Sequence, residues 1–123
     1  MWLKYSYITL IFITIISFTS HAQTSGDYRS AATGIWTTLT TWQRYNGSTW
    51  VTPTVAQGYP GQYIGTGAVT IKAGTTVTIG NSGIATQPIG SLTIENTGQL
   101  YLTGANSTVT FTINTSDVII NSE

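Results

Sequence analysis

The feature that most constrains the fold of this chain is a repeat in its second half. Segment 69–79 (VTIKAGTTVTI) aligns with segment 92–102 (LTIENTGQLYL) at an offset of 23 residues. Both copies alternate apolar and polar residues on either side of a turn, the pattern of strands with one buried face. Repeats of 20–50 residues indicate stacked units. The aligned apolar pairs are Val69 with Leu92, Ile71 with Ile94, Val77 with Leu100, and Ile79 with Leu102.

This repeat predicts an all-β fold that starts a parallel β-helix, or solenoid. Equivalent strands would stack about 4.8 Å apart, and the eight aligned apolar side chains would form one core. A third copy opens at 118–123 (VIINSE), with Val118 equivalent to Leu92, and an alternating segment at 108–113 predicts a further strand. The alternative is an antiparallel β-sandwich, which also has short strands separated by turns.

The third copy stops before its second strand, at residue 123. Solenoids need about three repeats before the stacked core outweighs the chain entropy. We therefore expect either that the natural protein continues past this residue or that the short form self-associates through its open sheet end.

Residues 1–22 have the organisation of a secretory signal peptide. Lys4 precedes an apolar stretch at 7–18, and the small residues Ser20 and Ala22 occupy positions −3 and −1 of a cleavage site. A membrane anchor is the alternative, but a spanning helix needs about 20 apolar residues, and this stretch is shorter. We expect cleavage after Ala22, no membrane span in the mature chain, and a secreted or outer-surface location.

The mature chain falls into two regions of different composition. Residues 23–63 are rich in Trp and Tyr, and residues 64–123 contain the Thr-, Val- and Ile-rich repeats. We interpret the first region as an aromatic N-terminal cap with a hairpin, because an open sheet end must be covered. The second region forms the β-solenoid coils, of which the third is truncated.

A hairpin is predicted at 41–51 (TWQRYNGSTWV), because Asn-Gly is the strongest short hairpin signal. A two-residue turn at Asn46-Gly47 places Tyr45 opposite Ser48. Alternation then gives Trp42 and Val51 one face, and Tyr45 and Trp50 the other. We expect Trp36 and Trp42 in the core, and Tyr45 and Trp50 exposed.

The composition argues against catalysis and against metal or cofactor binding. The chain after residue 22 has no His and no Cys, which excludes Ser-His and Cys-His nucleophile systems and the usual zinc ligands. Asp27 alone cannot hold calcium, and we interpret Glu95 and Asp117 as separate solvated carboxylates. We therefore predict no catalytic residue, no metal, no cofactor and no enzymatic activity.

Charged residues make up 7% of the chain, without the basic face that nucleic-acid binding requires. Lys72 and Glu95 occupy the same repeat position, with Asn121 next in the third copy, and should form an outward ladder. Tyr45 and Trp50 are the candidate glycan-stacking residues, because flat aromatic rings stack on sugars. We interpret the aromatic hairpin first as a structural cap, and a surface for a glycan or another cell-surface polymer is the alternative.

Segments 25–36, 41–51 and 69–79 together resemble the N-terminal module of large secreted surface proteins of Bacteroidetes-type bacteria. The similarity covers about residues 25–102, and the Trp and Tyr-Asn-Gly spacing is its most specific part. It implies a pectin-lyase-like right-handed parallel β-helix and export linked to type IX secretion, although no sorting domain follows here. The expected function is a non-enzymatic segment of a cell-surface or adhesin-like protein. The alternatives are a carbohydrate-binding module and the leading end of a polysaccharide-degrading β-helix.

Overall fold

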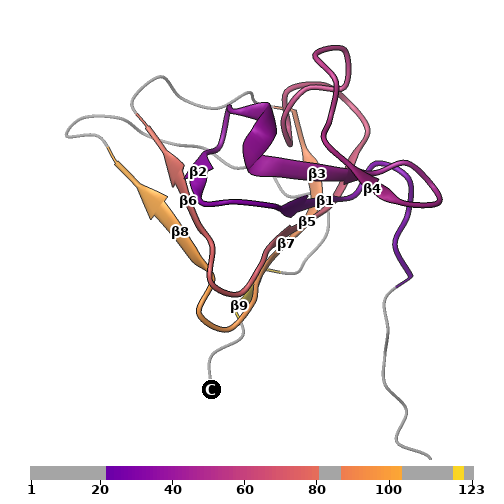
Figure 1. The fold of residues 1–123 in the computed structure, drawn as a ribbon. Helices are drawn as coiled ribbons and strands as arrows, with labels where there is room; N and C mark the ends of the chain where they lie inside the picture. The colour runs from indigo at the N-terminus through magenta and orange to yellow at the C-terminus, as the bar shows by residue number, and fades with distance from the viewer. Residues whose placement is uncertain (1–21, 81–86, 104–117, 121–123) are drawn as a thin grey trace, which may run out of the picture.

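A computed structural model describes residues 22–80, 87–103 and 118–120. Strands predominate in these residues, alongside a single short 3-10 helix, so the all-β prediction is confirmed (Figure 1). The strands are β1 (Tyr28–Ser30), β2 (Gly34–Ile35), β3 (Trp42–Tyr45), β4 (Trp50–Val51), β5 (Thr66–Ile71), β6 (Thr76–Ile79), β7 (Ile89–Ile94), β8 (Gln99–Leu102) and β9 (Val118–Ile120), and the helix η1 is Leu39–Thr41.

Four of the predicted features lie outside the described residues. They are the signal peptide up to residue 21, the strand at 108–113, Asp117 and Asn121.

The strands form two sheets, and the repeat register is confirmed in both. Their orders are β4-β3-β1-β5-β7-β9 and β2-β6-β8. Strands β5 and β7 pair in parallel, as do β6 and β8, and β9 adds in parallel to β7. Only β1–β3 and β3–β4 are antiparallel, so a wholly antiparallel sandwich does not describe these sheets. The paired residues are those that the alignment matched: Val69 with Leu92, Ile71 with Ile94, Val77 with Leu100, Ile79 with Leu102, and Leu92 with Val118.

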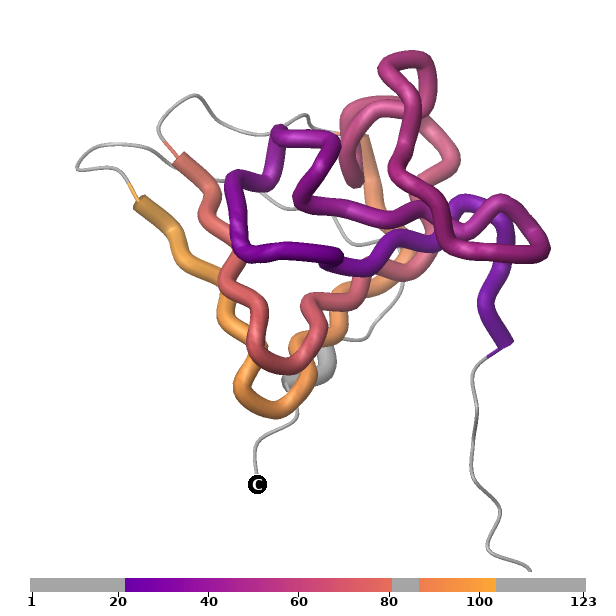
Figure 2. Tube along the Cα trace, in the orientation of Figure 1, coloured from indigo at the N-terminus to yellow at the C-terminus, as the bar shows by residue number. Residues whose placement is uncertain are grey.

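Each repeat copy bends once, so that its two strands lie in different sheets. In Figure 2 the segments 66–79 and 89–102 form two V-shaped units that lie one against the other. The bends carry equivalent residues with positive φ, Gly74 at 74° and Thr97 at 64°. The Gly74 N–H donates to Thr97 Oγ1 at 3.1 Å, which links the two bends directly.

The N-terminal strands extend this arrangement by one layer, which the sequence analysis did not predict. Strand β1 pairs in parallel with β5, and β2 pairs in parallel with β6. Ser30 joins this layer to the first bend, because its Oγ accepts from the Lys72 N–H at 2.8 Å and lies 2.6 Å from Thr75 Oγ1. The region predicted as a cap therefore contributes one parallel strand to each sheet.

The core lies between the two sheets and continues into the aromatic region. Trp36 and Trp42 are fully buried, as predicted, and their rings meet edge to face with centroids 4.8 Å apart. Their indole N–H groups donate to the carbonyls of Pro60 and Trp36, so neither ring buries an unpaired donor. The buried cluster is Tyr28, Trp36, Trp42, Val69, Ile71, Val77, Ile79, Ile89 and Leu92, with Tyr59, Ile94 and Leu100 partly buried against it.

The prediction of an eight-residue repeat core is wrong for Leu102, which is 61% exposed. Leu102 ends β8, which is the edge strand of its sheet in the described part of the chain. Alternation along β8 directs the Leu102 side chain toward the inner face of its sheet. It is buried only if a further strand or layer packs over that edge.

The hairpin forms, but its predicted register is wrong by two residues. Tyr45 lies opposite Trp50, and the Asn46 N–H donates to the Thr49 carbonyl, so the chain reverses at Gly47 and Ser48. Gly47 supplies the positive φ, at 102°. The Asn46 side chain instead accepts from the backbone N–H groups of Ser48 and Thr49, and this Asx-type bonding displaces it from the turn centre. A shift of two residues retains the face assignment.

Candidate functional site

Tyr45 and Trp50 share the outer face of the six-stranded sheet, as predicted. Their ring centroids are 5.3 Å apart and their planes are tilted by 52°. Both residues are half-buried and not freely exposed. Part of the reason is that the Arg29 guanidinium lies 4.4 Å from the Trp50 ring centroid. This cation–π contact, which sequence reasoning missed, covers one side of the ring that was predicted to bind sugar.

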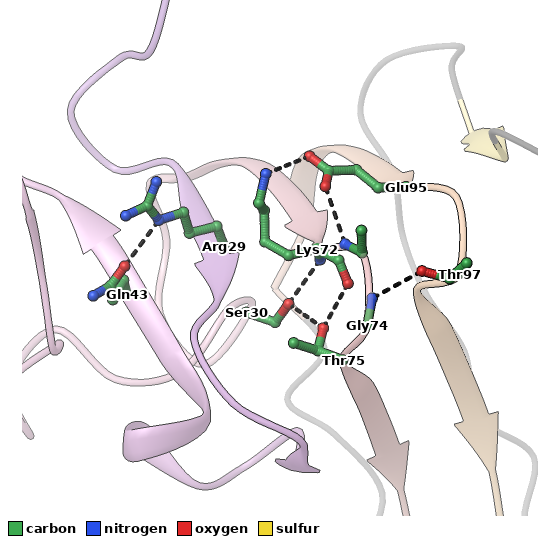
Figure 3. A network of polar contacts seen from close by, with 9 residues as sticks. Arg29, Ser30, Gln43, Lys72, Gly74, Thr75, Glu95 and Thr97 are labelled. Atoms are coloured by element: carbon green, nitrogen blue, oxygen red, sulfur yellow. Dashed lines mark hydrogen bonds and ion pairs between the residues drawn. The ribbon is translucent and has the colours of Figure 1, made fainter.

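The sheet register explains how Arg29 reaches this position. Arg29 in β1 is opposite Gln43 in β3 and Thr70 in β5, so the three side chains share the outer face. Arg29 Nε donates to Gln43 Oε1 at 2.8 Å, which fixes the guanidinium from one edge (Figure 3). Lys72 lies two residues after Thr70 and therefore on the same face.

A cleft of about 300 Å³ lies along this face, with the N-terminal segment as one wall. It combines an aromatic ring, two cations, two carboxylates and two threonine hydroxyls, a mixture of apolar and convergent polar groups typical of ligand sites. Tyr45 does not line it, although its partner Trp50 does. The lining residues are Ala22, Gln23, Thr24, Asp27, Tyr28, Arg29, Trp50, Ala68, Thr70, Lys72 and Glu95.

The Lys72–Glu95 pair forms the far end of the cleft and confirms the first step of the predicted ladder. Lys72 Nζ lies 2.7 Å from Glu95 Oε1, and the Ala73 N–H donates to the other carboxylate oxygen at 3.0 Å (Figure 3). Partial burial of Glu95 disfavours its ionised form, but the hydrogen bonds from Lys72 and Ala73 and the positive charges of Lys72 and Arg29 together outweigh this and lower its pKa.

We expect Glu95→Gln to destabilise the fold at neutral pH by about 0–1 kcal/mol, the range of partly exposed pairs. The folded-state pKa lies below the ordinary value of 4.5. The contribution of the ionised carboxylate is therefore complete above that value and disappears as the pH falls through the lower folded pKa. Urea unfolding of both proteins between pH 7 and pH 3 measures this, and a difference that grows on acidification would contradict it.

Asp27 is the main structural carboxylate of the site, and sequence reasoning did not identify it as such. Its side chain is 9% exposed and accepts from the N–H groups of Thr24 at 2.7 Å and Ala68 at 2.9 Å. It thereby fixes the N-terminal wall of the cleft to β5. This role of Asp27 could not be predicted from the Ser-Gly-Asp segment, because its partner Ala68 is 41 residues away in sequence.

Tyr28 lines the cleft and belongs to the buried core. Its hydroxyl shares its proton between the carbonyls of Gln57 and Gly58, at 3.1 and 3.0 Å. Burial raises the pKa of this phenol, although nearby Arg44 acts in the opposite direction. Tyr28 therefore anchors the loop after β4 as a neutral donor.

The described residues contain neither a metal-binding cluster nor a membrane-spanning helix. No group of three or more His, Cys, Asp or Glu side chains there is placed to hold a metal ion. None of the helical segments in the same residues has the length and apolar content needed to cross a membrane.

The chain matches no family model, no curated protein and no solved structure.

Proposed function

We propose that this chain is the start of an exported, non-enzymatic β-helix, and that it serves as the N-terminal segment of a cell-surface or adhesin-like protein. The observation that carries the proposal is the constant 23-residue offset at which both strands of each repeat copy pair in parallel. A β-helix needs this arrangement, because every coil must add one strand to each face.

In this proposal the aromatic region caps the first coil. Trp36, Trp42 and Tyr28 belong to the same buried cluster as Val69 and Ile71, so they cover apolar surface that would otherwise face water. Strands β3 and β4 continue the larger sheet in antiparallel sense beyond β1. The edge strand β4 is only two residues long, and so short an edge offers little backbone for another strand to pair with.

Surface location is tested with cells that express the full-length protein. Intact cells are treated with an external protease or labelled with an antibody against residues 23–63, and lysed cells serve as the control. The proposal requires cleavage or labelling in intact cells while a cytoplasmic marker stays protected. Protection equal to that of the cytoplasmic marker would contradict it.

We expect the exported protein to begin at Gln23, because Ser20 and Ala22 fit the −3 and −1 positions of a signal-peptide cleavage site. Mass spectrometry of the N-terminal peptide measures this, and cyclisation of Gln23 would lower the peptide mass by that of ammonia. Replacing Ala22 with a bulky residue, Ala22→Leu, should block the cleavage. An exported protein that retains residues 1–22 would rule out the signal peptide.

A second candidate function is glycan binding at the cleft beside Trp50. The observation that favours it is the combination of the Tyr45–Trp50 pair with a cleft that Trp50 lines. We expect Trp50→Ala to weaken the binding of any oligosaccharide that the wild type retains on a glycan array. Tyr101→Ala is the matched control, because Tyr101 is an aromatic residue that is 59% exposed and lies outside the cleft. Equal losses in the two variants would exclude the cleft as the site.

A further inference from the structure

Among the described residues, Arg29 forms no ion pair, although it lies near enough to Glu95 for its charge to help lower the pKa of that carboxylate. The Glu95 carboxylate is bound by Lys72 and by the Ala73 N–H. The Asp27 carboxylate accepts from two backbone N–H groups. Arg29 makes its one side-chain hydrogen bond through Nε, to the neutral amide of Gln43. Its two Nη groups have no hydrogen-bond acceptor among residues 22–80, 87–103 and 118–120, so these donors stay available to a ligand even though the two cations and two carboxylates of the cleft balance in charge.

The guanidinium is also held in place before any ligand arrives. The Trp50 ring lies against it at 4.4 Å, and Gln43 holds the Nε edge at 2.8 Å. A planar guanidinium in a fixed orientation presents two parallel N–H donors, which match the two oxygens of a carboxylate or sulfate group. Fixing it in advance reduces the entropy lost on binding.

The same contact changes the role of Trp50. A sugar ring that stacks on the covered side of Trp50 must first displace the guanidinium, so that side supports Arg29 and does not contact the ligand. Trp50 therefore acts as a positioning residue for the charge. The hydroxyls of Thr24 and Thr70 line the cleft as well and can bond to sugar hydroxyls.

We propose that this cleft binds the acidic group of a carboxylated or sulfated saccharide, with Arg29 as its anchor. This inference rests on the glycan-binding candidate above. It adds that the ligand is negatively charged and that Arg29 binds the charged group. The volume of about 300 Å³ is at the lower end of the usual range for small-molecule sites, which suits an acidic group and the ring that carries it.

The test measures binding of the exported protein to three oligosaccharides of equal length by isothermal titration calorimetry. The first contains glucuronic acid, the second is its carboxyl-reduced, neutral counterpart, and the third is a sulfated derivative of that neutral chain. We expect binding of the glucuronate or the sulfated form, at least tenfold weaker binding of the neutral form, and weakening as the salt concentration is raised. Which acidic form binds identifies the source of the charge.

Three variants separate the roles of the residues. Arg29→Gln should weaken acidic-ligand binding at least tenfold, and Arg29→Lys should restore only part of it, because an ammonium lacks the planar fork. Trp50→Ala should weaken binding of the acidic form while leaving its salt dependence in place, since the charge remains but is no longer held. Arg44→Gln removes one positive charge outside the cleft and should leave binding within about twofold of the wild type. Circular dichroism checks that each variant is folded.

The outcomes distinguish this inference from the candidate function on which it rests. Equal binding of neutral and acidic oligosaccharides, unaffected by Arg29→Gln, would overturn the anion site and leave glycan binding intact. Equal weakening by Arg44→Gln and Arg29→Gln would also overturn it, because net charge alone would then explain the effect. No binding of any of the three oligosaccharides would overturn both.

Discussion

Trp42→Ala is expected to lower the free energy of unfolding by about 3–5 kcal/mol. The Trp42 side chain is fully buried, meets Trp36 edge to face, and donates its indole N–H to the Trp36 carbonyl at 2.7 Å. The substitution removes the apolar contacts and the indole hydrogen bond, and it opens a cavity. A domain of this size has a total stability of roughly 5–15 kcal/mol, so the variant should lose a large part of its folded population. Urea unfolding followed by circular dichroism measures the loss.

Two further variants serve as comparisons for Trp42→Ala. Trp50→Ala changes the other tryptophan of the hairpin strands, which is half-buried and packs against Arg29 outside the core, and should cost clearly less than Trp42→Ala. Trp42→Phe keeps an aromatic ring but removes the N–H, and should fall between the wild type and Trp42→Ala. If Trp50→Ala proved as costly as Trp42→Ala, the aromatic region would not form part of the main core.

Ile71→Ala should lower the free energy of unfolding by about 2–5 kcal/mol, the range for truncation of a fully buried Ile to Ala. Ile71 is fully buried in β5 and pairs directly with Ile94 in the next repeat copy. Its removal leaves a cavity at the contact between two layers, and the parallel pairing on both sides limits how far the site can collapse. Tryptophan fluorescence during urea unfolding reports the change, because Trp36 and Trp42 are buried in the same cluster.

Ile64→Ala is the matched control, since the same side chain is truncated at a position that is 85% exposed. Its effect should stay within about 0.5 kcal/mol of zero. Ile94→Ala should fall between the two, because Ile94 is only partly buried. If Ile71→Ala cost no more than Ile64→Ala, the stacked repeat core would be ruled out.

The repeat and its register could be predicted from the sequence because they depend on two periodicities that one chain displays by itself. Alternation with a period of two decides which side chains face inward. The 23-residue offset decides which strands are equivalent, so Val69 opposite Leu92 and Lys72 beside Glu95 both follow from the alignment. The burial of Trp36 and Trp42 was also predictable, since large aromatic residues near an open sheet end have apolar surface to cover.

The extra N-terminal layer was not predictable, because its spacing differs from that of the repeat. Tyr28 pairs with Val69 and Gly34 pairs with Val77, and β1 and β2 are only three and two residues long. Strands this short carry too little alternation to be detected, and the aromatic insertion between β2 and β5 hides the offset. The parallel pairing of this layer depends on the folded position of β5 and β6.

The candidate site shows the same division between local and long-range information. Tyr45 and Trp50 could be assigned to one face of a hairpin from the sequence, because alternation survives a register error of two residues. The turn centre at Gly47 and Ser48 was missed although its cause is local, because the Asn46 side chain accepts hydrogen bonds from the N–H groups of Ser48 and Thr49. Only the tertiary structure placed the Arg29 guanidinium on Trp50, because β1 and β4 are both neighbours of β3 and the two side chains reach across it. Periodicity describes which way each side chain points along its own strand, whereas a cleft depends on which strands lie side by side.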